Sequence, residues 1–196
     1  MQGKQAKILT PTQERAILRH LETTRYSRRD TVMFLLSVKA GLRAKEIAGL
    51  TWTMVTDAEG HIVDALRLEN RVSKGRRGGR TIPLHPDLYK ALTQLYTECG
   101  DEAQLAHPII FSERGRGLSA TTVQLWFHRL YASLGFTGCS SHSGRRTFIT
   151  RAARKVSAVG GSLRDVQQLA GHASLSMTQE YIEGDSEAKR KLVALL

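Results

Sequence analysis

The spacing of hydrophobic residues changes twice along this 196-residue chain. Apolar positions recur with helical spacing up to about residue 50, alternate as in strands between Val55 and Leu84, and become helical again from Pro86 onward. The predicted helices begin at Pro11 and then cover about 28–40, 43–50, 86–98, 119–134, 142–157, 162–170, 174–183 and 186–195. The predicted strands lie around 62–68 and 81–84. We therefore expect one domain of the α+β class, mainly α, with a small antiparallel sheet.

Basic residues outnumber acidic ones by 29 to 18, which gives a formal net charge of +11. This excess indicates a polyanionic partner, most often nucleic acid, although a basic but otherwise ordinary globular protein is the alternative. Cys99 and Cys139 match no paired metal or disulfide spacing, which favours a reducing compartment. The N-terminus is polar and basic, and the longest apolar run, Val32 to Leu36, is too short to span a bilayer. We expect a cytoplasmic protein with no membrane partner.

The two predicted strands flank a glycine-rich, basic turn from Lys74 to Arg80. It is longer than a tight hairpin, and it lacks the Gly-Lys-Ser/Thr ending and the following helix of a P-loop. Lys74, Arg76, Arg77 and Arg80 are therefore either simply solvated or in contact with a nucleic-acid backbone. Residues 1–9 are predicted to form a short, disordered basic tail.

The helix predicted from His142 carries basic residues where apolar ones are expected. Its apolar residues share one stripe and are Phe148, Ile149, Ala152, Ala153 and Val156. His142 and Arg145 continue that stripe. An unpaired guanidinium in a core would cost several kcal/mol, so Arg145 needs an anionic partner or an open cleft.

Arg43 presents the same anomaly in the short predicted helix 43–50. It shares a face with Ile47 and Leu50, while Glu46 lies on the flank of that face. A structural Arg43–Glu46 ion pair at the edge of the core is one explanation. A bound phosphate is the other, and it would account for Arg43, Arg145 and His142 together, because the planar fork of arginine suits bidentate phosphate binding.

A histidine and a tyrosine close to the C-terminus look ordinary when each is taken alone. His172 follows Gly171 at the end of a predicted helix, where a capping or core histidine is common. In the next helix Leu175, Thr178 and Ile182 form the packing stripe. Tyr181 lies about a quarter turn off that stripe, as a tyrosine at the margin of a core does.

Taken together, these motifs resemble the tyrosine recombinase (phage integrase) family. They are Gly41-Leu42-Arg43-Ala-Lys-Glu46, Lys74 in a hairpin, His142-Ser-Gly-Arg145, Gly171-His172 and Tyr181. Each motif alone is weak, but six residue types in the right order, with the characteristic His172–Tyr181 separation, are highly specific. The resemblance runs from about Leu9 to the C-terminus. One departure is Gly144, where the family commonly has leucine, at a position that packs rather than reacts.

The resemblance implies metal-free and ATP-independent cleavage and rejoining of DNA, with no cofactor. Tyr181 would be the nucleophile that forms a 3′-phosphotyrosyl bond, Arg43 and Arg145 would bind the phosphate, and Lys74 would protonate the leaving oxygen. His142 would assist proton transfer from the tyrosine, and His172 would hydrogen-bond the phosphate. Glu46 would support the cluster. The expected DNA contacts are Arg76, Arg77, Arg80 and Arg146.

The resemblance also implies double-stranded DNA as partner and a homotetramer on DNA, with accessory proteins as further candidates. The amphipathic segment 186–196 is expected to dock either on its own domain or in trans on a neighbouring protomer. Only about nine residues precede the catalytic domain, so we expect no N-terminal core-binding domain. Two other functions remain open, a DNA-binding regulator or accessory factor with little cleavage activity and a type IB topoisomerase.

Overall fold

The computed structural model describes residues 5–73, 79–100, 105–181 and 193–194. It is mainly helical with a two-stranded antiparallel sheet, which confirms the predicted class. The helices are α1 (Pro11–Glu22), α2 (Ser27–Lys39), α3 (Ala44–Ala48), α4 (Pro86–Cys99), α5 (Ala120–Ser133), α6 (Ser143–Lys155), α7 (Leu163–Ala170) and α8 (Leu175–Gln179). Two 3-10 turns are η1 (Trp52–Met54) and η3 (Val156–Val159), and the strands are β1 (Ala65–Leu68) and β2 (Arg80–Pro83). The predicted helix 186–195 lies almost entirely outside the described residues.

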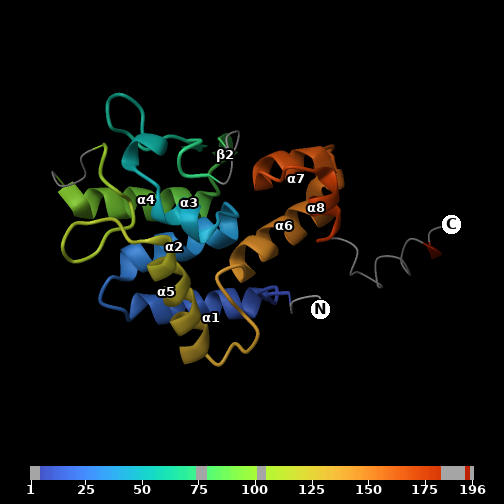
Figure 1. Ribbon diagram of the computed structural model, residues 1–196, viewed down its shortest axis with the longest axis horizontal. Helices are drawn as coiled ribbons and strands as arrows, with labels where there is room; N and C mark the ends of the chain where they lie inside the picture. The colour runs from blue at the N-terminus through green and yellow to red at the C-terminus, as the bar shows by residue number, and fades with distance from the viewer. Residues whose placement is uncertain (1–4, 74–78, 101–104, 182–192, 195–196) are drawn as a thin grey trace.

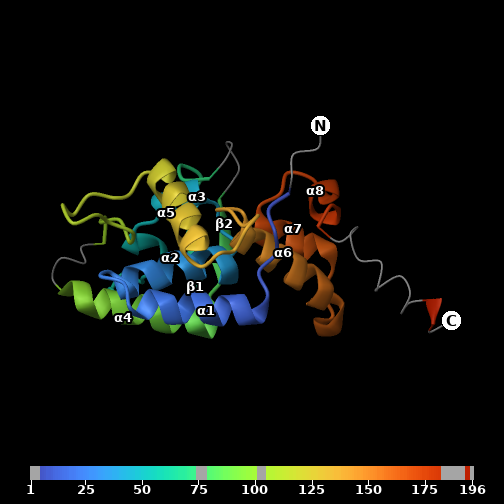
Figure 2. The ribbon, with the colours of Figure 1, turned by 90° about the horizontal axis from the view of Figure 1, so that it is seen from below.

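Helix α2 runs through the centre of the larger part of the molecule. Its residues from Val32 to Val38 are all buried, as expected of a helix that is apolar nearly all round. It packs on α1, α3, α4 and α6, and Figure 2 shows α2 between α1 and α4 on one side and α3 and α5 on the other. Within the part of the chain that the structure describes, no helix is both long and apolar enough to cross a membrane.

The small sheet brings Arg80 to the buried side of the molecule. β1 and β2 pair antiparallel, with Leu66 opposite Ile82 and Leu68 opposite Arg80. Side chains alternate along a strand, so Arg80 shares the face of Ile82, which is 1% exposed. At the strand ends, the Gly79 N–H donates to Asn70 Oδ1 at 2.7 Å and closes the base of the turn.

Helices α6, α7 and α8 form a smaller layer at one end of the molecule (Figure 1). Ile149, Val156, Val166 and Ala170 are its buried centre. Phe148, Ala152, Ala153 and Tyr181 pack against that centre from the sides. The stripe predicted for the helix after His142 is therefore confirmed, and it holds this layer together.

Part of the predicted N-terminal tail is packed against α6 rather than free. Leu9 is 1% exposed and its N–H donates to Thr147 Oγ1 at 2.8 Å. Lys7 N–H donates to Gly138 O at 3.1 Å, and Arg146 Nη1 donates to Ala6 O at 2.9 Å. The composition of residues 1–9 led to the wrong expectation for residues 5–9, because one buried leucine and a few backbone bonds are enough to dock an extended segment.

Candidate active site

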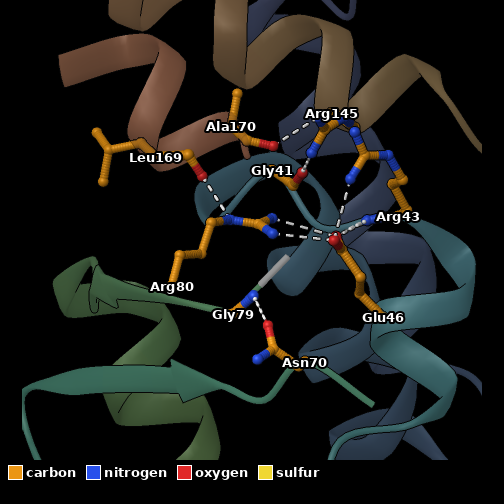
Figure 3. Close-up of polar contacts among 9 residues, drawn as sticks. All are labelled: Gly41, Arg43, Glu46, Asn70, Gly79, Arg80, Arg145, Leu169 and Ala170. Atoms are coloured by element: carbon orange, nitrogen blue, oxygen red, sulfur yellow. Dashed lines mark hydrogen bonds and ion pairs between the residues drawn. The ribbon is translucent and has the colours of Figure 1, made fainter. Parts of the chain in front are cut away.

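Two arginines share the buried carboxylate of Glu46 (Figure 3). Glu46 Oε1 accepts from Arg43 Nη1 at 3.1 Å and from Arg80 Nη1 at 2.9 Å. Oε2 accepts from the Arg43 backbone N–H at 2.8 Å and from Arg80 Nη2 at 3.2 Å. Burial acts to raise the pKa of Glu46, but the hydrogen bonds and charge of Arg80, followed by those of Arg43, outweigh it and lower the pKa. Glu46 is therefore a carboxylate at neutral pH, and the predicted Arg43–Glu46 ion pair is confirmed.

The turn before α3 sets the direction of Arg43. Arg43 is the residue before the helix, in extended conformation, and Glu46 caps the helix through the Arg43 N–H. Gly41 has a φ of +66°, and a Cβ there would lie 2.4 Å from Phe148 Cδ1. A glycine is thus required both by the backbone angle and by the close approach of α6.

Arg145 points inward, as predicted, and is 4% exposed. Its Nη1 donates to Gly41 O at 2.6 Å and its Nη2 donates to Ala170 O at 2.7 Å. Among the described residues it forms no ion pair with a carboxylate. Burial, and next the positive charge of Arg43, lower the pKa of Arg145 to about 10, so the group stays charged at neutral pH.

Among the described residues, Glu46 is the one carboxylate of this cluster: it pairs with Arg43 and Arg80 and acts on Arg145 only through its charge, which leaves an excess of two positive charges in a largely buried cluster. Such an excess is costly without a counter-ion. A phosphate group supplies the missing negative charge and accepts hydrogen bonds from arginine forks. The arrangement is therefore suited to binding a phosphate beside Arg43 and Arg145.

His172 is close enough to Arg145 to be affected by its charge, and it contacts the predicted nucleophile Tyr181. Its Nδ1 is 2.9 Å from Thr178 Oγ1, and its ring stacks on Tyr181 with centroids 5.5 Å apart. Burial and then the charges of Arg145, Arg43 and Arg80 lower the pKa of His172 to about 4. The imidazole is therefore neutral at pH 7. The sequence did not reveal Thr178 as a partner, although its place on the stripe of α8 indicated that it would be buried.

Gly171 connects α7 to His172 in a left-handed turn with a φ of +61°. A Cβ at this position would lie 2.7 Å from Arg80 Nη1. Gly171 is therefore required for the turn and also for the approach of Arg80.

A cavity of about 300 Å³ lies between α6 and the residues after α8. It is lined by Gln5, Ala6, Ser140, His142, Arg145, Arg146, Glu180 and Tyr181. The half-buried Tyr181 follows α8, so the predicted nucleophile borders the same space as Arg145.

The prediction that His142 is directed inward on the stripe of α6 is wrong. His142 caps the N-terminus of α6 with a backbone in the helical region, but its side chain is exposed, because the packing that covers the apolar stripe does not extend to this end of the helix. It nevertheless lines the cavity with Arg145 and Tyr181. The His142 side chain is therefore accessible to solvent and to a ligand bound in the cavity.

The predicted DNA-contacting residues fall into two sets. Lys74, Arg76 and Arg77 lie outside the described residues. The sequence groups Arg80 with that turn, but the structure places its side chain in the Glu46 cluster. Arg146 donates to the N-terminal segment through Nη1, and its buried Nε has no hydrogen-bond partner among the described residues. Contact of any of these residues with DNA stays a prediction.

The sequence model of the phage integrase family matches residues 7–187. The chain belongs to the phage integrase family. This result confirms the predicted resemblance, since the matched range contains all the motifs that carry it.

Two curated relatives in this family are tyrosine recombinases XerC. The protein of Brucella suis biovar 1 (strain 1330) is 30% identical over 160 residues, which are 81% of this chain and 47% of the relative. The protein of Methylobacterium sp. (strain 4-46) is 33% identical over 159 residues, which are 81% of this chain and 46% of the relative. The chain therefore spans about half the length of the curated relatives it matches.

Solved structures of the family share the fold. XerA recombinase superposes with a TM-score of 0.74 at 19% identity, covering 100% of this chain and 65% of that one. The Tn1549 transposon integrase in complex with transposon right-end DNA gives a TM-score of 0.73 at 20% identity, covering 96% and 65%. At such low identity these structures support the fold of the family.

Proposed function

We propose that this chain is the catalytic domain of a site-specific DNA recombinase that cleaves and rejoins DNA through a 3′-phosphotyrosyl intermediate. The observation that carries the proposal is that Tyr181 borders the same cavity as Arg145, which belongs to the cluster with excess positive charge. Family membership supports the same chemistry, because the curated relatives are named tyrosine recombinases.

In the proposed cleavage step, the Tyr181 oxygen attacks the phosphorus of a DNA phosphodiester. The bond between phosphorus and the 5′-oxygen breaks, and the 3′-phosphate remains bonded to the tyrosine. The phenolic proton passes to His142, while Lys74 donates a proton to the leaving 5′-oxygen. Attack by the 5′-hydroxyl of a partner strand reverses these transfers and rejoins the DNA.

Arg43 and Arg145 would bind the non-bridging oxygens and stabilise the charge that develops on them. His172 is neutral at pH 7, so it would act as a hydrogen-bond donor to the phosphate rather than as a charge. When the Thr178 hydroxyl donates to Nδ1, the single ring proton lies on Nε2, which can then donate to a phosphate oxygen. The energy of the phosphodiester is conserved in the covalent intermediate, so the cycle requires no ATP.

The proposal includes double-stranded DNA as substrate, assembly as a homotetramer on DNA, and action in the cytoplasm with or without accessory proteins. The net charge of +11 supports a polyanionic partner. The relatives offer a parallel, because the Tn1549 integrase was solved with transposon DNA and lambda integrase as a dimer on a core site.

The test is the formation of a covalent protein–DNA adduct. Nicked duplexes with a randomised core are incubated with the protein, the adducts are separated on a denaturing gel, and their DNA is sequenced. Wild type is expected to form an adduct and Tyr181→Phe none. Binding of DNA by wild type without any adduct would favour a regulator, and an adduct that persists in Tyr181→Phe would reject this nucleophile.

A second assay separates a recombinase from a topoisomerase. A recombinase exchanges strands between two duplexes, whereas a topoisomerase only relaxes supercoils.

A further inference from the structure

Arg80 donates two side-chain hydrogen bonds to Glu46, whereas Arg43 donates one. All the donor groups of Arg80 that face the cluster are used, since Nη1 and Nη2 donate to Glu46 and Nε donates to Leu169 O at 2.8 Å (Figure 3). Its side chain is 8% exposed. Arg43 donates to Glu46 through Nη1 alone, and its side chain is 26% exposed. Within the described residues, Nε and Nη2 of Arg43 form no hydrogen bond, so this guanidinium has donors available.

We propose that Arg80 is a positioning residue that occupies Glu46 and thereby keeps Arg43 available for a DNA phosphate. The inference rests on the proposed function of the cluster as a phosphate site. A buried carboxylate must be paired, and a guanidinium fork matches it with two parallel hydrogen bonds. Without Arg80, two acceptor positions on Glu46 would be open, and the nearest free donors are those of Arg43. The carboxylate would then neutralise the group that should bind the phosphate.

The net charge of the cluster also predicts weaker phosphate binding without Arg80. With Arg80 present the cluster has an excess of two positive charges, and without it the excess falls to one. The lower positive charge and the closer Arg43–Glu46 pair would both weaken the binding of a phosphate beside Arg43. Removing Glu46 together with Arg80 leaves Arg43 and Arg145 alone and returns the excess to two.

Arg80 also fixes the end of α7. Its bond to Leu169 O is one residue before Ala170, whose carbonyl accepts from Arg145. Its Nη1 lies 2.7 Å from the position that a Cβ would take on Gly171, the residue that leads to His172. One side chain therefore contacts both the carboxylate that pairs with Arg43 and the end of α7, next to the carbonyl that accepts from Arg145.

The experiment compares Arg80→Gln, the double variant Arg80→Gln/Glu46→Gln, and Arg67→Gln. Arg67 is exposed on β1 in the same hairpin, so its variant is a matched control that removes one positive charge outside the cluster. The first readout is the affinity for inorganic phosphate, obtained from the rise in melting temperature at constant ionic strength. The second readout is the single-turnover rate of adduct formation on a nicked duplex.

Arg80→Gln is expected to lower both quantities about tenfold, which corresponds to about 1.4 kcal/mol. The double variant is expected to recover most of that loss, and Arg67→Gln to stay within about twofold of wild type. A role limited to stability would lower the melting temperature measured without phosphate but leave the phosphate affinity of the folded protein unchanged. Equal values for Arg80→Gln and Arg67→Gln, or a double variant no better than Arg80→Gln, would overturn the proposal.

A buried, unpaired Glu46 could prevent Arg80→Gln from folding. In that case Arg80→Lys is used, which keeps the charge but lacks the planar fork. It is expected to bind phosphate more weakly than wild type, and wild-type values in both readouts would overturn the proposal. If wild type forms no adduct, the proposed function fails, whereas phosphate affinity still tests the role of Arg80.

Discussion

The imidazole of His172 lies on the phenol ring of Tyr181, with centroids 5.5 Å apart and planes inclined by 26°. His172 lies in the turn between α7 and α8, and Tyr181 lies just after α8. His172 is held by Thr178, which is fully buried in α8. The position of the proposed nucleophile thus depends on how α8 packs, because the helix carries both the partner of His172 and the chain that leads to Tyr181.

Thr178→Val is expected to lower the rate of adduct formation about tenfold. Valine has the same shape but cannot bond His172 Nδ1, so the ring loses the contact that sets its orientation and tautomer. The measurement is single-turnover adduct formation, together with the melting temperature. Thr150→Val is the matched control, since Thr150 Oγ1 is buried on α6 without a partner among the described residues. A rate for Thr178→Val equal to that of Thr150→Val would contradict this role.

Stability is expected to fall as the pH decreases from about 6.5 to about 4 because of His172. Its pKa is lowered in the folded protein to about 4, so in this window the unfolded chain binds the proton and the folded chain does not. The sign follows from linkage, in which the free energy of unfolding rises with pH wherever the unfolded state binds more protons. The loss over the whole window is on the order of 3 kcal/mol, of which about 2 kcal/mol is reached at pH 5.

Urea denaturation at pH 7.5 and pH 5 measures this loss, with His172→Gln as the comparison. The variant lacks the titrating group, so its free energy of unfolding should change less between the two pH values. Glu46 does not mask the effect, because its pKa is lowered from an ordinary value near 4.5 and its contribution is lost at still lower pH. An equal pH dependence in wild type and His172→Gln would refute the assignment.

The sequence predicted the site best where regular secondary structure carries the side chain. The helical stripe of α6 correctly placed Arg145 inside, and the position of Glu46 three residues after Arg43 correctly indicated their ion pair. It failed for His142, whose backbone is helical but whose side chain is exposed at the N-terminal cap of α6, where the covered stripe ends.

Arg80 was missed for a different reason. Its alternation with Ile82 indicated a buried side chain, but the basic composition of the turn outweighed that signal. The hydrogen bonds of Arg80 to Glu46 and Leu169 and the contact of His172 with Thr178 depend on tertiary packing. Local spacing carries no information on contacts between residues from distant elements.

Leu9→Ala is expected to lower the free energy of unfolding by about 2–4 kcal/mol. Leu9 is 1% exposed and belongs to the main hydrophobic core, so its truncation leaves a cavity. The neighbouring Ile8 is 37% exposed, and Ile8→Ala is the matched control, for which a change below about 1 kcal/mol is expected. Chemical denaturation measures both variants. Similar small losses in the two would show that the segment before α1 is not anchored by Leu9.

Deletion of residues 186–196 is expected to weaken assembly on DNA. The segment has an amphipathic pattern that ends in apolar residues, which suits docking on a neighbouring protomer. Light scattering of the protein on a DNA duplex, before and after the deletion, measures the size of the assembly. The thermal stability of the free protein is the control, because a loss there would instead indicate that the segment docks on its own domain. Unchanged assembly would reject docking in trans.

Gly144→Ala is expected to destabilise the protein by about 1–3 kcal/mol. At Gly144, α6 crosses α2 so closely that a Cβ would lie 2.3 Å from Ser37 Oγ and 2.9 Å from Ser37 Cβ. Since both atoms belong to Ser37, Ser37→Gly should offset part of the loss in the double variant, less the cost of about 1 kcal/mol for a glycine inside α2. Denaturation of the two single variants and the double variant forms a cycle that isolates their coupling. Additive losses would show that Ser37 does not impose the glycine, whereas a favourable coupling would show that the close contact of α2 and α6 at Ser37 requires it.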